Sequence, residues 1–359
     1  MASTTHARVL MVGPDRSLRG GIVSVVDGYF DAGLPAHCAR IDYHGTGVGT
    51  NLLTKSLAFA RSLSAYKRVL DGYDIVHLHI SAKGSYQRKK IMARIAREYG
   101  KQVILHEHSG EFARDFEAGG DAYRQDVRAT FGAADRVIVL SEEWRDYFAA
   151  NVCDASRLVV LHNGVKVPPE PCSPGLHRDV LFLGRLDERK SPDVLMRAAR
   201  SVLAEFPNMR FLFGGDGDID RYRTLAGELD IASSCDFFGW LSGEDKERLF
   251  QRAGIYCLPS KNEAMPMSVM EAMAHGIPTI ATRVGGVPQL IEDGVDGLLM
   301  NVDDEGRLSE LLLELERLPE RRAEVGAAGR RKILDKFTID VSVDRLVGVY
   351  EELMREPGR

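Results

Sequence analysis

No run of apolar residues in this chain of 359 approaches the ~20 that a helix needs to span a bilayer. The first thirteen residues, MASTTHARVLMVG, also lack the apolar stretch of a secretory signal peptide. Residues 8–13 are typical of a first buried strand instead. From these absences we expect a protein of the cytoplasm.

Cysteine is scarce and scattered. The five cysteines are odd in number, with neither a C-x-x-C pair nor a spacing to histidine that suits a metal. They are Cys38, Cys153, Cys172, Cys235 and Cys257. This pattern favours a reducing compartment, in which cysteines act as small apolar residues, and it predicts no metal site.

Several nucleotide and metal motifs are absent as well. No G-x-G-x-x-G follows the first predicted strand, and no G-x-x-x-x-G-K-[ST] occurs, which disfavours a dinucleotide-dependent enzyme and a P-loop NTPase. No D-x-D triplet is evident at a predicted strand end, which agrees with a reaction that needs no metal. The net charge of −5 and the lack of a nucleic-acid motif argue against a nucleic-acid partner.

Basic side chains are concentrated in residues 55–101, which hold 11 Lys and Arg against 3 Asp and Glu. One interpretation is a pair of solvated helix faces. The other is a surface for an anionic membrane or an anionic acceptor, because each basic residue near such a membrane contributes ~1 kcal/mol.

Short apolar runs alternate with helical patterns along the whole chain, which predicts parallel sheets of the doubly wound kind. Between the two halves, residues 163–175 carry four prolines and two glycines, as an interdomain linker would. We therefore predict two Rossmann-like domains, 1–168 and 169–338, facing a cleft, with ligands at the carboxyl ends of the strands. The predicted strands are 8–12, 38–42, 75–79, 102–106, 136–140, 158–161, 180–184, 210–214, 235–238, 255–258, 278–281 and 297–300.

Glycines and cations follow the strands of the second half. Gly184, Arg185 and Lys190 lie before a helix and could clamp a diphosphate, or form a surface salt-bridge cluster instead. Gly215 ends another strand. Phe238 and Gly239 end the next, where an aromatic edge and backbone could meet a nucleobase or simply pack in the core.

The segment SKNEAMPMSVMEAMAHGIP, residues 260–278, places two glutamates at a helix start. Pro266 suits the first helical position, so Glu263 precedes the helix and Glu271 lies about one turn inside it. Carboxylates beside free N–H groups could accept hydrogen bonds from sugar or ribose hydroxyls. The alternative is a surface helix with two solvated glutamates.

Two features of the first half are candidates for binding. Gly20 and Gly21 precede a helix and could admit a phosphate, or form an ordinary tight turn. His106 and His108 follow the strand at 102–106 and could face the ligand, or serve as structural histidines.

These elements together resemble the retaining glycosyltransferases of family 4, which have the two-domain GT-B fold. The resemblance covers nearly the whole chain, and its most specific motifs are VLFLGRLDERKS, FLFGGDG, FFGWL and the segment 260–278. It implies that Arg185 and Lys190 hold the diphosphate of a sugar nucleotide and that Glu271 binds its ribose. It also implies that Glu263 and the following loop bind the donor sugar. That loop reads E-A-M-P where the family often has E-G-F-G, and Met267 and Ser268 remain candidate contacts.

The first half is similar to members that build bacterial exopolysaccharides, through YDIVHLH, GSYQRK and VILHEHSGEF. The resemblance implies that His108, with His106 left open, lies beside the reacting sugar and that Gly20 and Gly21 contact phosphate. A C-terminal helix in 339–359 would cross back to the first domain.

The expected reaction is hexosyl transfer with retention from a UDP- or GDP-sugar to a glycan or lipid-linked acceptor, without metal or cofactor. The alternatives are a sugar-nucleotide epimerase or phosphorylase, or a non-catalytic nucleotide-sugar-binding module.

Overall fold

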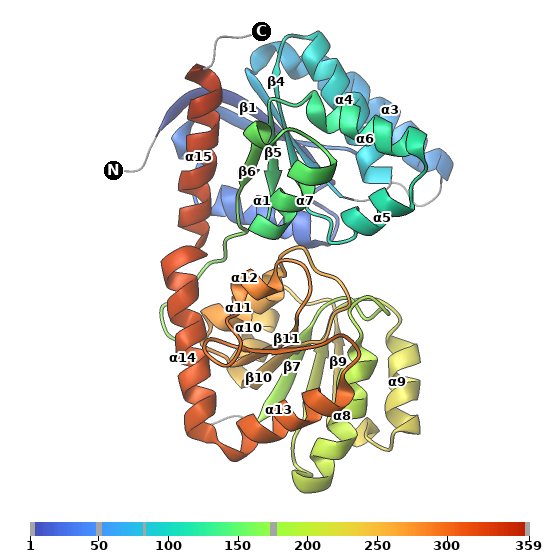
Figure 1. Cartoon of the computed structure of the whole chain (residues 1–359), viewed down its shortest axis with the longest axis vertical. Helices are drawn as coiled ribbons and strands as arrows, with labels where there is room; N and C mark the ends of the chain where they lie inside the picture. The colour runs from blue at the N-terminus through green and yellow to red at the C-terminus, as the bar shows by residue number, and fades with distance from the viewer. Residues whose placement is uncertain (1–3, 48–51, 82–83, 173–177, 356–359) are drawn as a thin grey trace. The chain divides into compact units, whose positions relative to one another are not determined.

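A computed structural model describes residues 4–47, 52–81, 84–172 and 178–355 of the chain. It divides into two compact units, each with its own parallel sheet between layers of helices (Figure 1). The first unit contains the chain up to Gly164 and again from Ile339 onward, and the second contains Val165–Thr338. The last helix, α15 (Ile339–Arg355), therefore belongs to the first unit, as predicted.

The sheet of the first unit has the order β2-β1-β3-β4-β5-β6, with every neighbouring pair parallel. Its strands are β1 (Thr5–Gly13), β2 (Cys38–Gly45), β3 (Ile75–Ile80), β4 (Gln102–Glu107), β5 (Arg136–Val139) and β6 (Leu158–Val160). Its other helices are α1 (Gly21–Asp31), α2 (Leu34–His37), α3 (Leu52–Val69), α4 (Gly84–Glu98), α5 (Phe112–Ala118), α6 (Asp121–Gly132) and α7 (Glu142–Asn151).

The alternation of β3 assigns its residues to the two faces of this sheet. Val76, Leu78 and Ile80 join the apolar core on the face that α3 and α4 cover. His77 and His79 point to the opposite face, where α15 lies beside β1 and Tyr350 of α15 contacts His77 (Figure 1). One face of β3 is therefore apolar, and the other buries imidazoles.

The sheet of the second unit has the order β12-β11-β10-β7-β8-β9 and is also parallel throughout. Its strands are β7 (Asp179–Leu183), β8 (Phe211–Gly214), β9 (Cys235–Gly239), β10 (Ala253–Leu258), β11 (Thr279–Thr282) and β12 (Leu298–Met300). Its helices are α8 (Pro192–Glu205), α9 (Ile219–Glu228), α10 (Gly243–Arg252), α11 (Met267–Ala274), α12 (Val287–Leu290), α13 (Glu305–Arg317) and α14 (Pro319–Lys336).

All twelve predicted strands are present, each within two or three residues of its predicted ends. The helix predicted at the glutamate segment is α11, but Pro266 is its N-cap rather than its first helical residue. Among the described residues, no helix is long and apolar enough to cross a membrane. The five cysteines form no disulfide.

We predict that Tyr350→Phe destabilises the first unit by about 1–3 kcal/mol, because it leaves Nδ1 of buried His77 without its 2.8 Å hydrogen bond to the tyrosine hydroxyl. Urea unfolding followed by tryptophan fluorescence would measure the loss. Met354→Ala, at an exposed position on the same helix, is the control and should change stability by less than ~0.5 kcal/mol. Equal effects of the two substitutions would contradict the prediction.

Candidate active site

Four predicted site residues of the second unit follow four neighbouring strands. Gly184 follows β7, Gly215 follows β8, Gly239 ends β9, and Glu263 lies in the loop after β10. Because the strands are parallel and adjacent in the order β10-β7-β8-β9, these positions lie along one edge of the sheet. This is the edge at which ligands of open α/β sheets bind.

An ion pair joins two of the loops at this edge. The Lys190 ammonium contacts the Glu263 carboxylate, and the side chains are only 13% and 7% exposed. The backbone N–H of Lys261 also donates to the carbonyl of Arg189 at 2.8 Å. The loop after β7 and the loop after β10, 73 residues apart in sequence, are thus held as one structure. The alternative of a solvated Glu263 on a surface helix is therefore not what the structure shows, because this side chain is buried and paired.

Glycine is required where the loops approach each other most closely. A β-carbon at Gly215 would lie 1.8 Å from the carbonyl oxygen of Gly184. A β-carbon at Gly285 would lie 1.7 Å from the carbonyl oxygen of Glu263, and φ there is +50°. The loop that begins at Gly285 therefore packs directly on the backbone of Glu263 and helps to fix its position.

Glu271 lies inside α11, one turn from the helix start, as predicted. Its carboxylate forms an ion pair with Lys246 of α10 at 2.6 Å, and both side chains are partly exposed. Ser268 is half-buried in the first turn of α11. The hydroxyl of buried Tyr256 donates to the carbonyl of Leu183 at 3.1 Å, which ties β10 to β7.

The remaining predicted residues of this unit are more open. Arg185 is largely exposed and reaches Asp187 only at 3.5 Å, so its guanidinium stays available to an anion. Phe238 is 39% exposed and Trp240 is 38% exposed, so neither is a plain core residue. Met267 is half-buried at the start of α11.

A D-x-D triplet does occur close to one strand end. Asp216, Gly217 and Asp218 follow β8 after Gly215, where we had expected no such triplet at a strand end. Asp218 caps α9, its carboxylate accepting a hydrogen bond from the N–H of Arg221 at 3.2 Å. Its role in this structure is therefore to begin a helix.

In the first unit, Gly20 and Gly21 lie at the start of α1, after the carboxyl end of β1. Nothing lies within 4 Å of a β-carbon built at either position. Close packing therefore does not require either glycine, and both lie at the N-terminus of an 11-residue helix, where a phosphate-contacting loop would be found.

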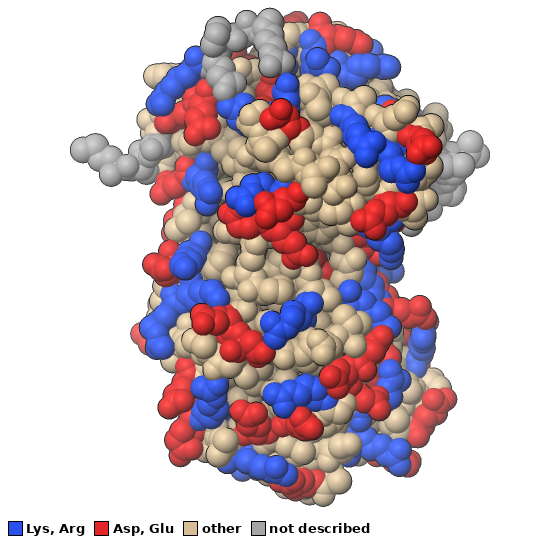
Figure 2. Space-filling view, in the orientation of Figure 1, with Lys and Arg blue, Asp and Glu red and all other residues tan. Residues whose placement is uncertain are grey.

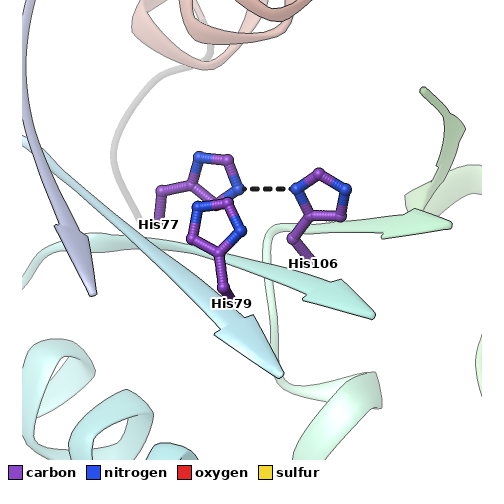
Figure 3. A group of neighbouring side chains, drawn as sticks. All are labelled: His77, His79 and His106. Atoms are coloured by element: carbon purple, nitrogen blue, oxygen red, sulfur yellow. Dashed lines mark hydrogen bonds between the residues drawn. The ribbon is translucent and has the colours of Figure 1, made fainter. Parts of the chain in front are cut away.

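Four histidines lie together on one face of the first sheet. His77 and His79 come from β3 and His106 from β4 (Figure 3). His108 follows β4 directly, and its ring packs against those of His79 and His106. His77 Nε2 is 3.2 Å from His106 Nδ1, and His79 Nδ1 is 2.9 Å from His108 Nε2. His106 is fully buried within this cluster, whereas His108 is partly exposed. Of the two histidines that the sequence left open, His108 is the accessible one.

Burial keeps this cluster uncharged at neutral pH. Desolvation lowers the pKa of His77 to about 3 and that of His108 to about 3. The pKa values of His79 and His106 also lie well below the ordinary range, mainly through desolvation. A neutral imidazole at His108 can donate or accept a hydrogen bond but does not act as a general acid near pH 7.

A metal site needs three or more ligand atoms close together. Within the described parts of the chain, one such group of His, Cys, Asp or Glu residues occurs: His77, His79 and His106, whose ring nitrogens lie within 4.8 Å of one another. His77 already uses both ring nitrogens in hydrogen bonds, to Tyr350 and to His106. The arrangement is that of a hydrogen-bonded cluster beneath α15.

The basic segment 55–101 is not one solvated surface. Lys89 is fully buried, and Lys90 forms an ion pair with Asp126. Lys83 lies outside the described residues. The clearly exposed cations are Lys55, Arg61, Lys67, Arg68, Arg94 and Arg97. On the face that Figure 2 shows, basic and acidic side chains are interspersed rather than separated by sign.

Sequence reasoning missed Lys246 and His79, and it named Lys89 only as one cation of the basic segment 55–101. Lys246 lies in a run of charged residues, and nothing in that run distinguishes the lysine that reaches Glu271. The H-x-H spacing of His77 and His79 was visible, because alternate strand residues share a face. The second histidine pair, on β4, lies beside His77 and His79 because β3 and β4 are neighbouring strands with His79 opposite His106. The sequence alone does not show this pairing.

Two family models match the chain. Residues 2–164 match the glycosyl transferase 4-like domain, and residues 173–332 match the glycosyl transferases group 1. The putative glycosyltransferase EpsD of Bacillus subtilis is 29% identical over 322 residues, covering 84% of this chain and 82% of that protein. The D-inositol 3-phosphate glycosyltransferase of Mycolicibacterium smegmatis is 29% identical over 313 residues, with 79% and 68% covered.

Two solved structures share the fold. Alr3699/HepE of Anabaena, in complex with UDP-glucose, superposes with a TM-score of 0.78 at 17% identity, covering 98% of this chain and 100% of that one. Sucrose-phosphate synthase of Thermosynechococcus elongatus gives a TM-score of 0.78 at 18% identity, with 97% and 99% covered. With the two parallel sheets, these matches confirm the predicted GT-B fold class.

We predict that acid destabilises the first unit through the histidine cluster. Above pH 6.5 both the folded and the unfolded chain hold neutral histidines, so stability is complete there. As the pH falls, only the unfolded chain binds protons until about pH 3, where the pKa of folded His77 lies. At pH 5 each such histidine lowers the free energy of unfolding by about 2 kcal/mol. Urea unfolding at pH 7 and pH 5 should therefore show a smaller loss in His77→Gln than in the unsubstituted protein; identical losses would contradict the prediction.

We predict that Gly285→Ala destabilises the second unit by about 2 kcal/mol or more beyond Gly294→Ala. Both glycines have positive φ, but only the β-carbon at Gly285 would meet the Glu263 carbonyl, since that at Gly294 meets nothing closer than 3.9 Å. The control thus carries the backbone strain alone, about 1–2 kcal/mol. Thermal unfolding of the two variants would test this, and equal melting temperatures would show that the close approach costs nothing.

Proposed function

The chain belongs to the family 4 glycosyltransferases of the GT-B fold, and from that premise we propose that it transfers a hexosyl unit from a UDP- or GDP-sugar to an acceptor hydroxyl with retention of configuration. Transfer of a glycosyl group from a nucleotide sugar is the activity of the family. The observation that carries the proposal is the buried Lys190–Glu263 pair at the carboxyl edge of the second sheet.

The reaction first requires that the departing diphosphate be bound and its charge stabilised. Arg185 and Lys190 would hold it, with Gly184 and Gly215 allowing the backbone to approach it closely. Glu263 offsets the charge of buried Lys190 in their ion pair, and a diphosphate would give the lysine a second anionic partner. Cations in a partly dry site stabilise the charge that develops on the leaving group, and we propose that no metal is needed.

The reaction also requires that the sugar and the ribose of the donor be held in place. Glu263 would accept hydrogen bonds from the sugar hydroxyls, and Glu271 from the ribose. Lys246 would then lie beside the ribose through its ion pair with Glu271. Met267 and Ser268 begin α11, where free N–H groups compensate for the donor that Pro266 lacks. Phe238 and Gly239 end β9 and would meet the nucleobase.

In the first unit, His108 would hydrogen-bond the transferred sugar, and Gly20 and Gly21 would contact a donor phosphate. The ring of His108 is oriented by His79 through Nε2, and its Nδ1 forms no hydrogen bond among the described residues. Because its pKa is low, the imidazole positions the sugar instead of supplying a proton. The acceptor proton would pass to the leaving phosphate as the acceptor oxygen bonds the anomeric carbon and the bond to the diphosphate breaks.

A UDP donor is supported by the likeness to HepE, whose structure holds UDP-glucose. We propose a glycan or lipid-linked acceptor in bacterial polysaccharide or glycolipid synthesis, with residues up to 168 serving the acceptor and 169–338 the donor. The protein would work in the cytoplasm. Contact with an anionic membrane would use the exposed cations of α3, such as Lys67 and Arg68, rather than buried Lys89.

We predict that Glu271→Gln raises the KM for the nucleotide sugar about 10- to 100-fold, because a hydrogen bond to a charged partner contributes ~1.5–3 kcal/mol. Glu228→Gln, at the exposed end of α9, is the control and should leave the KM unchanged. The measurement is release of nucleoside diphosphate, with the sugar product followed by NMR.

The same measurement separates the alternatives. A transferase releases nucleoside diphosphate, either by transferring the sugar or by slowly hydrolysing the nucleotide sugar. The anomer that forms first shows whether the configuration is retained or inverted. An epimerase would change the sugar while it stays attached to the nucleotide. Binding without any product would indicate a non-catalytic module, and unchanged kinetics in Glu271→Gln would remove the ribose assignment.

A further inference from the structure

The backbone of His108 is held in place by hydrogen bonds on both sides of the residue. Its N–H donates to the carbonyl of Ile80, at the end of β3, at 2.9 Å. The N–H of the next residue, Ser109, donates to the carboxylate of Glu107 at 2.7 Å. Two things are left for the side-chain contacts to decide: the orientation of the imidazole, and the ring nitrogen that carries its proton.

Two neighbouring rings hold the imidazole of His108. The centroid of the His106 ring lies 4.1 Å from that of His108, and the centroid of the His79 ring lies 5.1 Å from it. Nδ1 of His79 is 2.9 Å from Nε2 of His108, which is a hydrogen-bond distance. Nδ1 of His108 forms no hydrogen bond among the described residues, and this side chain is partly exposed. Nδ1 is therefore the atom that His108 offers to a ligand.

The burial of His79 decides which of the two rings donates the hydrogen bond. Burial holds the pKa values of both histidines below the ordinary range, so at pH 7 each ring carries one N–H and one lone pair. Nε2 of His79 is buried without a hydrogen-bond partner. A proton on Nε2 would be a buried donor with nothing to bond, and buried N–H groups are nearly always paired. The proton of His79 is therefore on Nδ1, and His79 donates to Nε2 of His108.

The neighbouring pair, His77 and His106, follows the same rule (Figure 3). Nε2 of His106 is also buried without a partner, so the proton of His106 is on Nδ1 and is donated to Nε2 of His77 at 3.2 Å. His77 then donates from Nδ1 to the hydroxyl oxygen of Tyr350 at 2.8 Å. In both pairs the ring atom left unpaired in the interior is a lone pair and not an N–H.

The hydrogen bond from His79 has a consequence for the exposed side of His108. A neutral imidazole that accepts a hydrogen bond at Nε2 carries its proton on Nδ1. The ring therefore presents an N–H donor to a ligand, and the matching ligand atom is an oxygen with a free lone pair. Without the N–H of His79, nothing at Nε2 would keep the proton of His108 on Nδ1.

We propose that His79 is a positioning residue for glycosyl transfer: by donating to Nε2 of His108 it fixes the proton of His108 on Nδ1, which then hydrogen-bonds an oxygen of the transferred sugar. The inference rests on the proposed function and deepens it, because it states which atom of His108 acts and in which direction. It also limits the class of donor, since the sugar must present a hydroxyl or carboxylate oxygen to this N–H. A sugar that lacks this oxygen would leave the N–H unpaired and would be used poorly.

The first test is the position of the protons in the unsubstituted full chain. With histidine labelled in ¹⁵N, long-range ¹⁵N–¹H correlation spectra distinguish a protonated ring nitrogen from an unprotonated one. The signals of the two residues are identified by their loss in His79→Phe and in His108→Gln. We expect the protons of both His79 and His108 on Nδ1. A proton on Nε2 of His108 in the folded, unsubstituted protein would overturn the proposal.

The second test is turnover, measured as release of nucleoside diphosphate. The donor is the one that the unsubstituted protein consumes fastest among UDP-glucose, UDP-N-acetylglucosamine and GDP-mannose. His79→Phe keeps a ring but has no N–H, so kcat/KM should fall about 5- to 100-fold. His79→Asn keeps an amide N–H near the position of Nδ1 and should recover most of that loss. Equal turnover of His79→Phe and the unsubstituted protein would overturn the proposal.

His77→Phe is the matched control for a purely structural role. It removes a buried imidazole from the same face of β3, but one that bonds His106 and Tyr350 instead of His108. Its melting temperature should fall, whereas kcat/KM should stay close to that of the unsubstituted protein. Equal losses of kcat/KM in His77→Phe and His79→Phe would assign His79 to the fold alone and overturn the proposal.

Deoxygenated donors test the hydrogen bond to the sugar directly. Among the 3-, 4- and 6-deoxy analogues of the donor, one should carry an extra loss of kcat/KM in the unsubstituted protein, and this extra loss should nearly vanish in His79→Phe. Inhibition by the free nucleoside diphosphate, which lacks the sugar, should be the same in both proteins. Deoxy penalties that are identical in the two proteins, or a weaker inhibition that matches the loss of kcat/KM, would overturn the proposal.

The two levels of inference fail in different ways. If the unsubstituted protein releases nucleotide but His108 carries its proton on Nε2, only the role of His79 fails. If none of the three nucleotide sugars is consumed, the proposed function itself fails, whatever the spectra show for the two histidines.

Discussion

The ion pair between Lys190 and Glu263 is the constraint on which the second unit's site depends. It joins the loops after β7 and β10, neighbouring strands whose ends lie far apart in the sequence. Both side chains are nearly buried, so each needs the other to offset its desolvation. The close backbone approaches at Gly215 and Gly285 are compatible with this pair because neither residue has a β-carbon. A polyanionic ligand would enter a site whose charges are already balanced and fixed.

The first unit handles its buried polar groups differently. Its histidines are kept neutral by burial. His77 hydrogen-bonds both His106 and Tyr350 of α15, and His79 pairs separately with His108. The last helix of the chain is therefore part of the setting of His108, although it lies more than 200 residues later in the sequence. Arg88 and Lys89, on the helix after β3, form no ion pair with a carboxylate among the residues that the structure describes.

Much of the fold could be read from residue patterns. Apolar runs such as that of β10 are continuous because parallel strands are buried on both faces, and all twelve were recognised. The position of Glu271 inside α11 followed from Pro266 and the helix formers after it, although the proline proved to be the cap. Strand ends and loop residues could be assigned to a site because parallel strands bring their carboxyl ends to one edge. The sequence also left His106 and His108 as alternatives.

The sequence by itself determined the two sheets and the residue types that follow their strands, because these depend on local periodicity and on the direction of parallel strands. Only the tertiary structure decided which charges are paired and which are buried. Lys190, Lys246 and Lys89 are the same residue type. Lys190 pairs with Glu263, Lys246 pairs with Glu271, and Lys89 hydrogen-bonds the hydroxyl of Thr46. The physical reason is that pairing and desolvation depend on neighbours from distant strands and helices, which no local pattern encodes.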